Sequence, residues 1–229
     1  MSKKNAQLLF PHESMRETQE DMIEAVQRAL EEKKGLVVHA PTGIGKTVSA
    51  LAPALSFALK KNLTVFFLTS RQTQHKIAID TLQKIKKKHG NTFSVVDLIG
   101  KRSMCLQDLS FLQSADFLDQ CKKLREKNLC ENYTNTRKKT MQLTVLAEHA
   151  VSELKSMGPQ HVNDLINYCE KPKLCPYELS AFMVKDAQVV IADYNMIFHP
   201  SVRDSLFSRA SKKLSDCIIV VDEGHNLPA

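Results

Sequence analysis

Glycine and proline are scarce in this chain: the 229 residues include 7 Gly and 8 Pro, and there is no low-complexity tract. This composition argues against a disordered or fibrous protein. No apolar run reaches the roughly 18 residues that a membrane helix needs. Residues 1–7 are polar and lack the apolar core of a secretion signal. We therefore expect a soluble, intracellular protein with no membrane partner, cytoplasmic or, in a eukaryote, nuclear.

Acidic residues are outnumbered by basic ones, which gives a formal net charge of +7 and a pI of about 9.1. A basic surface favours polyanions, nucleic acid first. The basic residues gather in four clusters, at 84–88, 101–102, 122–127 and 137–139. Solvated helix faces account for most such clusters, so charge alone does not identify the partner.

Short apolar runs alternate with amphipathic segments at both ends of the chain. Four runs are typical of buried parallel strands: 36–40, 64–69, 188–192 and 217–221. Three segments are predicted helices: 21–33, 47–60 and 72–89. This alternation predicts an α/β fold with a parallel sheet. Residues 101–180 hold no buried-strand run and are predicted to be an inserted region of short helices and loops.

A phosphate-binding loop follows the first predicted strand. Residues 40–47 read Ala-Pro-Thr-Gly-Ile-Gly-Lys-Thr, the P-loop pattern with Ala in place of its first glycine. The glycines would turn backbone N–H groups toward phosphate oxygens. Lys46 would bind the β- and γ-phosphates, and Thr47 would hold Mg²⁺. A chance glycine turn before a helix is the alternative. The predicted nucleotide-binding residues of the loop are Thr42, Gly43, Gly45, Lys46 and Thr47.

The run 217–221 ends in two acids, Asp222 and Glu223. Asp222 would hold Mg²⁺ through water, and Glu223 would polarise the attacking water as general base. His225 would couple the nucleotide state to the rest of the protein. A plain strand end with surface acids is the alternative, which the upstream P-loop disfavours. With Lys46, these three residues are the predicted catalytic set.

Five of the six cysteines lie between positions 105 and 175. Cysteines in a reducing compartment tend to be buried residues, metal ligands or catalytic groups rather than disulfides. Cys105, Cys121, Cys130 and Cys175 are separated by 15, 8 and 44 residues. Zinc sites usually use close C-x-x-C pairs, whereas widely spaced single cysteines fit an iron–sulfur cluster. Spacing alone does not settle the metal.

The chain as a whole resembles the XPD-like branch of iron–sulfur DNA helicases, which includes the DinG and FANCJ groups. The likeness runs over residues 10–226 and rests on segments in the family's order. These are 10–13 with 16–19 (the adenine-reading segment), 40–47 (motif I), 69–71 (motif Ia), 100–105, 129–133 and 174–178 (around cluster cysteines), 192–195 (before motif II) and 222–225. The last segment is similar to the DEAH box of superfamily-two helicases, with Gly224 in place of Ala. The family likewise uses Ala40 in its motif I.

The resemblance implies a RecA-like ATP-binding domain made of residues 1–100 and 181–229, with a helical 4Fe–4S insert at 101–180. It implies that Gln19 hydrogen-bonds the adenine base. It also implies that the cluster is held by Cys105, Cys121, Cys130 and Cys175. Cys169 is the alternative fourth ligand, and Cys217 is expected to be a core residue.

By the same resemblance the cofactors are ATP, Mg²⁺ and the 4Fe–4S cluster, and the substrate is single-stranded or forked DNA, unwound 5′→3′. The family's arch domain and second motor domain, with the arginine that completes the ATP site, would follow Ala229. We therefore expect a fragment or split-gene product whose partner is the missing C-terminal half, with little ATP turnover alone. Two alternatives stay open: a non-catalytic DNA- or partner-binding module, and a P-loop ATPase with a zinc-binding insert.

Overall fold

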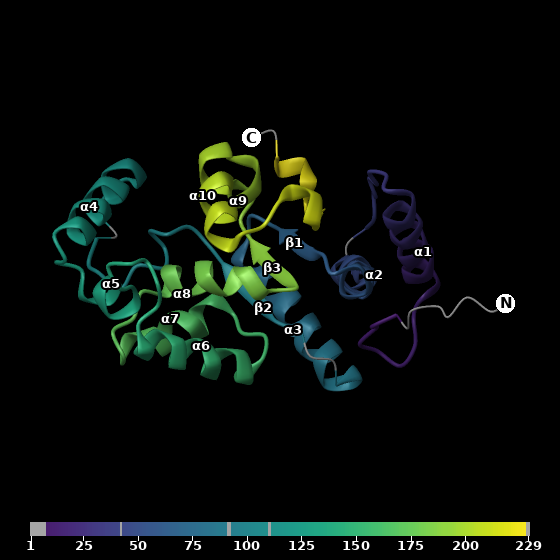
Figure 1. Ribbon diagram of the computed structural model, residues 1–229. Coiled ribbons are helices and arrows are strands. Elements are labelled where there is room, and N and C mark those ends of the chain that lie inside the picture. Colours follow the sequence, from purple (N-terminus) through teal and green to yellow (C-terminus); the bar gives the residue numbers. More distant parts are fainter. Residues whose placement is uncertain (1–7, 42, 91–92, 110, 228–229) are drawn as a thin grey trace. The chain divides into compact units, whose positions relative to one another are not determined.

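The computed structural model describes residues 8–41, 43–90, 93–109 and 111–227 (Figure 1). The chain divides into two compact units: Met1–Val95 with Ala187–Tyr194 and Lys213–Ala229, and Val96–Asp186 with Asn195–Lys212. One sheet has the strand order β2-β3-β1-β4, and β1 pairs in parallel with both β3 and β4. The predicted α/β class with a parallel sheet is thereby confirmed. No helix in the described part of the chain is long and apolar enough to cross a membrane.

The first unit is built around β1. Its elements are α1 (Glu17–Glu32), α2 (Lys46–Lys61), β1 (Thr64–Leu68), α3 (Gln72–His89), β3 (Val189–Ala192), η2 (Leu214–Asp216), β4 (Cys217–Val221) and η3 (Gly224–Asn226). All five residues of β1 are buried, and Phe66 lies opposite Val190 of β3 and Ile219 of β4. A parallel strand with neighbours on both edges and side chains buried on both faces requires a continuous apolar run. The sequence Thr-Val-Phe-Phe-Leu meets that requirement.

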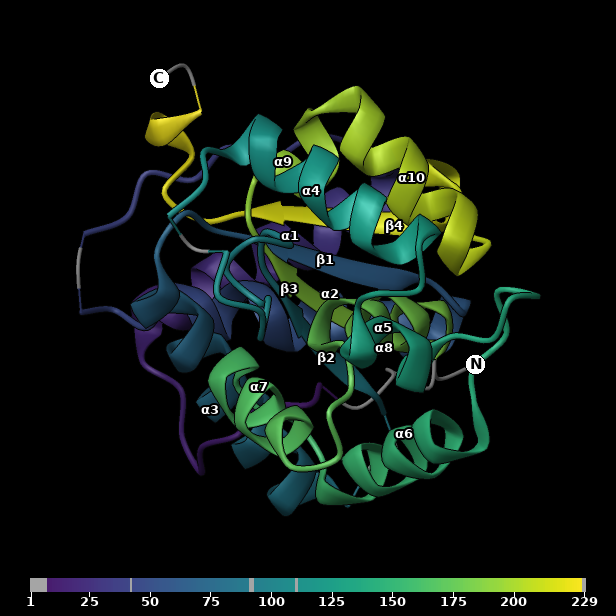
Figure 2. The same cartoon turned by 90° about the vertical axis from the view of Figure 1, so that its left-hand side faces the viewer.

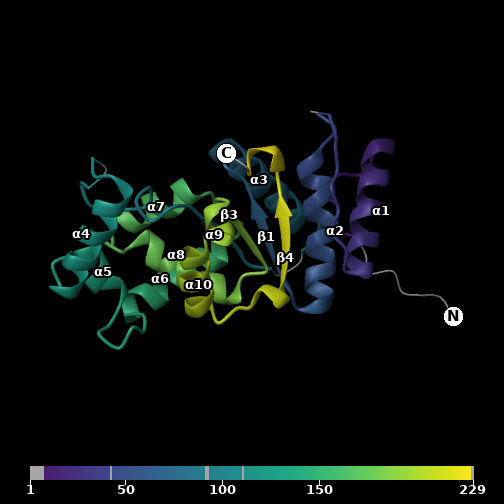
Figure 3. The ribbon, with the colours of Figure 1, turned by 90° about the horizontal axis from the view of Figure 1, so that it is seen from above.

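Helix α2 positions the phosphate loop. Its buried face includes Leu51, Ala52, Leu55 and Ala58, which are fully buried in the core of this unit. The helix packs against α1 and α3 and against β1 and β4, and Figure 3 shows it between β4 and α1. Because α2 is anchored along its length, its first residue, Lys46, is held at a fixed place.

The second unit is helical apart from β2 (Val95–Leu98), whose first residue marks the division between the units. Its other elements are α4 (Ser114–Glu126), α5 (Glu131–Thr136), α6 (Val145–Met157), α7 (Val162–Glu170), α8 (Pro176–Met183), η1 (Val184–Asp186), α9 (Asn195–Phe198) and α10 (Pro200–Ala210). Helix α8 is central, because it packs against α5, α6, α7 and α10. Figure 2 shows α8 with α6 on one side and α10 on the other.

The predicted strand at residues 36–40 is wrong. These residues form no regular secondary structure and lie outside the sheet, and Leu36 is 43%, Val37 98% and Val38 42% exposed. A strand forms only where its backbone groups pair with a neighbour, and an apolar run of five residues does not specify that partner. Helix α1, predicted over 21–33, runs from Glu17 to Glu32 and ends there because Lys33 adopts the left-handed conformation (φ 54°).

Candidate nucleotide site and cysteine pocket

The phosphate loop turns sharply into α2. Gly43 and Gly45 have φ angles of 85° and 86°, a left-handed conformation that glycine adopts without steric cost. Helix α2 begins at Lys46, immediately after Gly45, and Thr47 is half-buried in its first turn. The first N–H groups of a helix lack intrahelical partners and suit an anion. Thr42, another predicted nucleotide contact, lies outside the described residues.

Gln19 is hydrogen-bonded to this loop. Its Nε2 donates to the Ile44 carbonyl at 2.9 Å, and its Oε1 accepts the backbone N–H of Arg16 at 3.1 Å. A Cβ added at Gly45 would displace the amide end of Gln19, a flexible side chain, so the positive φ is the stricter requirement for glycine there. Arg16 makes a second hydrogen bond to the loop, from its Nη1 to the Gly43 carbonyl at 3.1 Å. The residue predicted to bind adenine is therefore bonded at both amide atoms to the chain itself.

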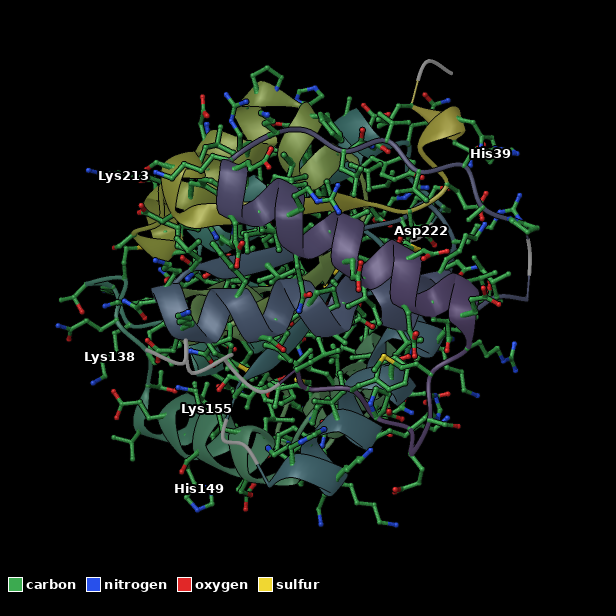
Figure 4. All side chains as sticks on the ribbon, turned by 90° about the vertical axis from the view of Figure 1, so that its right-hand side faces the viewer. His39, Lys138, His149, Lys155, Lys213 and Asp222 are labelled. Carbon is green, nitrogen blue, oxygen red and sulfur yellow. The ribbon has the colours of Figure 1, made fainter. Side chains whose placement is uncertain are left out.

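The acidic pair stands at the end of β4, where Figure 4 labels Asp222. The Asp222 N–H donates to the Leu68 carbonyl at 2.9 Å and so extends the pairing with β1. The Tyr194 hydroxyl, just beyond β3, donates to the carbonyls of both Asp222 and Glu223. Glu223 has a φ of 53°, an uncommon conformation for a residue other than glycine, and such conformations cluster at functional sites. The left-handed residue of this turn is thus Glu223, and not Gly224.

Lys46 and the acids form one electrostatic group. Lys46 Nζ lies 3.3 Å from Glu223 Oε1, and His225 Nδ1 lies 3.4 Å from Glu223 Oε2. Asp222 Oδ2 is buried without a hydrogen-bond partner among the described residues. Burial, reinforced by Glu223, raises the pKa of Asp222 above its usual value despite Lys46. A bound divalent cation would satisfy this oxygen and favour its charge, so the residues present fit Mg²⁺.

Four cysteines line a single pocket of the second unit. Cys105, Cys121, Cys130 and Cys175 all contribute to its wall, and the pocket has a volume of ≈ 370 Å³, part of it open to solvent. In the described part of the chain, no three His, Cys, Asp or Glu side chains are close enough together to hold a single metal ion. Cys169 lies in α7, fully buried and outside the pocket's lining residues.

Backbone N–H groups affect the pKa of three of these four thiols. Cys130 and Cys175 are the N-cap residues of α5 and α8. Neither residue makes a side-chain capping hydrogen bond, but the N–H groups of Tyr133 and Glu178 lower the pKa of these two thiols, as that of Gln107 lowers the pKa of Cys105. Burial nevertheless raises the pKa of Cys130, and that of Cys175 to about 12. These donors suit thiolates, whose charge a bound metal would stabilise.

Comparison with known proteins decides the family. Residues 53–229 match the sequence model of DEAD_2. The chain belongs to the DEAD_2 family. It is 21% identical over 234 residues to the General transcription and DNA repair factor IIH helicase subunit XPD/RAD3 of Saccharomyces cerevisiae, covering 96% of this chain and 30% of that protein. It is 28% identical over 221 residues to the ATP-dependent DNA helicase YoaA of Haemophilus influenzae, covering 93% of this chain and 33% of that protein.

The fold of this DEAD_2 chain is also found among solved structures. A structure titled truncated XPD has a TM-score of 0.58 and 24% identity, and covers 93% of this chain and 53% of its own. The expected XPD-like superfamily-two helicase family is therefore confirmed. The chain spans about a third of the length of these two curated relatives.

The structure gathers the predicted site residues of the DEAD_2 domain into two groups. The first lies in the first unit and comprises Gln19, Gly43, Gly45, Lys46, Thr47, Asp222, Glu223 and His225. The second is the set of four cysteines that share the pocket. The assigned roles of all these residues, as nucleotide contacts, catalytic groups and metal ligands, stay predictions. Cys217, expected in the core, is half-buried in β4.

Three residues with specific contacts at these sites were missed. Arg16 bonds the phosphate loop, Tyr194 bonds both carbonyls of the acidic turn, and Glu178 carries a buried carboxylate beside the cysteine pocket. A signal existed for Arg16, because its spacing of three from Gln19 brings both to one end of a helix. Glu178 stands among the apolar residues of α8, where an acid is out of pattern.

Proposed function

We propose that this DEAD_2 domain is the ATP-binding part of an ATP-dependent DNA helicase. The proposal rests on the short distance between the phosphate loop and the acidic residues that follow β4. Lys46 at the start of α2 lies 3.3 Å from Glu223 at the end of β4, and the neighbouring Asp222 has a buried, unpartnered Oδ2. A cation for phosphate, a carboxylate for Mg²⁺ and a candidate general base are the parts that phosphoryl transfer to water requires.

Each residue has a definite role in this proposal. Lys46 exchanges its bond with Glu223 for the β- and γ-phosphates, which leaves the Glu223 carboxylate free to take a proton from water. Thr47 and Asp222 would hold Mg²⁺, which, when bound, neutralises phosphate charge. Gln19 would read adenine with the second N–H of its Nε2 and the second lone pair of its Oε1, while it keeps its bonds to the Ile44 carbonyl and the Arg16 N–H.

We also propose that the cysteine pocket holds a 4Fe–4S cluster. A zinc ion needs its sulfurs within about 2.3 Å of one point, whereas a cluster spreads its thiolates over several irons. Four widely spaced cysteines around one pocket support the cluster assignment. Backbone N–H groups near Cys105, Cys130 and Cys175 lower the pKa of these thiols and so favour the thiolate form that a cluster requires.

The DNA substrate is part of the proposal. Its support is the net charge of +7 and the relatives, one of which is named an ATP-dependent DNA helicase. We propose 5′→3′ unwinding that depends on a second motor domain, because phosphoryl transfer in such motors uses an arginine from outside this part. A non-catalytic binding module would bind DNA without hydrolysing ATP when that domain is supplied.

The nucleotide proposal is tested by Mg²⁺-dependent ATP binding. Asp222→Asn keeps the shape of the side chain and removes its charge, and Asp80→Asn, exposed on α3, is the matched control. We expect wild type and the control to bind ATP more tightly with Mg²⁺ than with EDTA, and Asp222→Asn to lose that difference. Equal Mg²⁺ dependence in all three proteins would disprove the assignment of Asp222.

The cluster proposal is tested by anaerobic purification with a visible spectrum and iron and sulfide counts. We expect a broad band near about 400 nm and about four irons per chain. Colourless protein with zinc would support the alternative ATPase, and colourless protein with no metal would leave the pocket unexplained.

A further inference from the structure

A buried carboxylate lies beside the cysteine pocket. Glu178, in the first turn of α8, has a side chain that is 0% exposed. Its Oε1 lies 2.9 Å from Arg209 Nη1, and its Oε2 lies 3.1 Å from Arg137 Nε. Lys101 Nζ and Arg125 Nη1 approach Oε1 at 3.8 and 4.0 Å. Four cations therefore surround one buried negative charge.

Three of these cations come from cysteine-bearing segments. Lys101 precedes Cys105 by four residues, and Arg137 directly follows α5, whose N-cap is the cysteine at 130. Arg125 follows Cys121 by four residues on α4 and donates from Nε to the Cys121 carbonyl at 3.3 Å. Glu178 itself stands three residues after the cysteine at 175. One carboxylate is thus connected to all four segments that supply the pocket's sulfurs.

Aromatic rings hold the same three cations in place. Lys101 Nζ lies 5.2 Å from the centroid of the Tyr177 ring, and the Arg125 guanidinium lies 5.3 Å from that of Tyr133. Both rings line the cysteine pocket. Arg137 lies 5.6 Å from the Phe182 ring and also donates to the Glu178 carbonyl at 3.3 Å. Such contacts fix the direction from which a cation approaches its partner.

Helix α4, which carries one of the four cysteines, has little apolar packing. Helix α4 has Phe117 as the buried residue among its thirteen. Burial opposes the charge of Glu178, but Arg209, Lys101 and Arg137 outweigh it and hold the pKa of that carboxyl below its usual range. A buried charge is tolerated only with such partners, and removal of one side of the arrangement leaves the others uncompensated.

We propose that Glu178 is the positioning residue that assembles the cysteine pocket, drawing the cysteine segments together through Lys101, Arg125 and Arg137 without any bound metal. The choice of 4Fe–4S as the ligand rests on the proposed function. The assembly of the four thiols does not, because it is measurable on metal-free protein.

The test compares Glu178→Gln with Asp186→Asn. Asp186 belongs to the same unit and pairs with Lys155, labelled in Figure 4, at 2.8 Å in an exposed ion pair. We expect Glu178→Gln to release iron to a chelator about tenfold faster than wild type, the scale on which residues behind metal ligands act. We expect its metal-free form to expose the pocket thiols to a thiol reagent at a correspondingly higher rate, with the modified cysteines located by mass spectrometry. The control should match wild type in both.

Two arginine variants separate positioning from general stabilisation. Arg137→Gln removes a tie to a cysteine segment, whereas Arg209→Gln removes a bond of similar length from α10, outside those segments. Faster iron loss and thiol modification in Arg137→Gln than in Arg209→Gln support the proposal, even where Glu178→Gln fails to fold. Equal rates in the two arginine variants, or wild-type rates in a folded Glu178→Gln, overturn it. If wild-type protein contains no iron, the cluster proposal is refuted, but the proposal for Glu178 is not. The rates of thiol modification would then decide whether Glu178 assembles the pocket.

Discussion

The Lys46→Ala variant removes the ammonium group at the start of α2 and with it the 3.3 Å ion pair to Glu223. Alanine is the most favourable residue within a helix, so α2 should form as before. The change therefore tests the role of Lys46 in nucleotide binding with little disturbance of the fold around it.

The two expected effects differ in size. The side chains of Lys46 and Glu223 are 29% and 26% exposed, and a pair so accessible to solvent contributes up to about 1 kcal/mol to the free energy of unfolding. A bond between the ammonium and phosphate is charge-assisted and contributes about 1.5–3 kcal/mol to binding. That loss corresponds to a dissociation constant for Mg–ATP roughly 10- to 150-fold higher.

Calorimetric titration with Mg–ATP and urea unfolding measure these two quantities on the same preparations. Lys60→Ala, in the last turn of the same helix, is the control for loss of one positive charge on α2. We expect weakened ATP binding in Lys46→Ala alone, with urea midpoints close to wild type in both variants. ATP affinity within about twofold of wild type in a folded Lys46→Ala protein would refute the P-loop assignment.

Three further outcomes follow from the contacts. Gly45→Ala should lower the free energy of unfolding by about 1–2 kcal/mol in urea titrations, because its φ of 86° is unfavourable for any residue with a Cβ. An unchanged free energy of unfolding would contradict that geometry. Glu178→Gln should lower the free energy of unfolding by on the order of 3 kcal/mol near neutral pH. The pKa of Glu178 is lowered in the folded protein. The stabilisation by its carboxylate is therefore fully present above the unfolded-state pKa of about 4.3 and is lost as the pH falls through the folded-state pKa. The free energies of unfolding of wild type and Glu178→Gln should accordingly converge at acid pH. Cys130→Ser should bleach the visible band while Cys217→Ser, in β4, leaves it unchanged, and a reversed result would place the metal elsewhere.

The sequence predicts the fold best where one local pattern is enough. The helix at 72–89 has the predicted bounds, since its periodicity is long and Gly90 ends it in a left-handed conformation. The strand at 217–221 likewise has the predicted bounds, but all five of its residues are half-buried rather than buried. Strand β2 was missed because Asp97 interrupts its apolar run. That carboxylate is buried because it accepts the backbone N–H of Val162 at 2.9 Å, a partner 65 residues away that no local pattern reveals.

The residues of the candidate sites can likewise be predicted where a local motif contains them, but not where distant segments meet. The loop around Lys46 and the acid at Asp222 are local motifs with a strand or helix beside them, so their residues can be named from the sequence. The bond from Gln19 to the Ile44 carbonyl joins segments 25 residues apart, and the tie from Arg137 to Glu178 joins segments 41 apart. Neither follows from spacing, because each depends on how helices pack in three dimensions.

The double engagement of Gln19 has a consequence for which triphosphates the loop accepts. With Nε2 on the Ile44 carbonyl and Oε1 on the Arg16 N–H, the amide is oriented before any base arrives, and its second N–H and second lone pair can still meet a base. Under the proposed function, the preference for adenine rests on a hydrogen bond from Gln19 that contributes about 1 kcal/mol. Triphosphates with other bases would lose that bond and keep their phosphate contacts. Discrimination between ATP and GTP by this domain should therefore be shallow, roughly fivefold, with the phosphates setting most of the affinity.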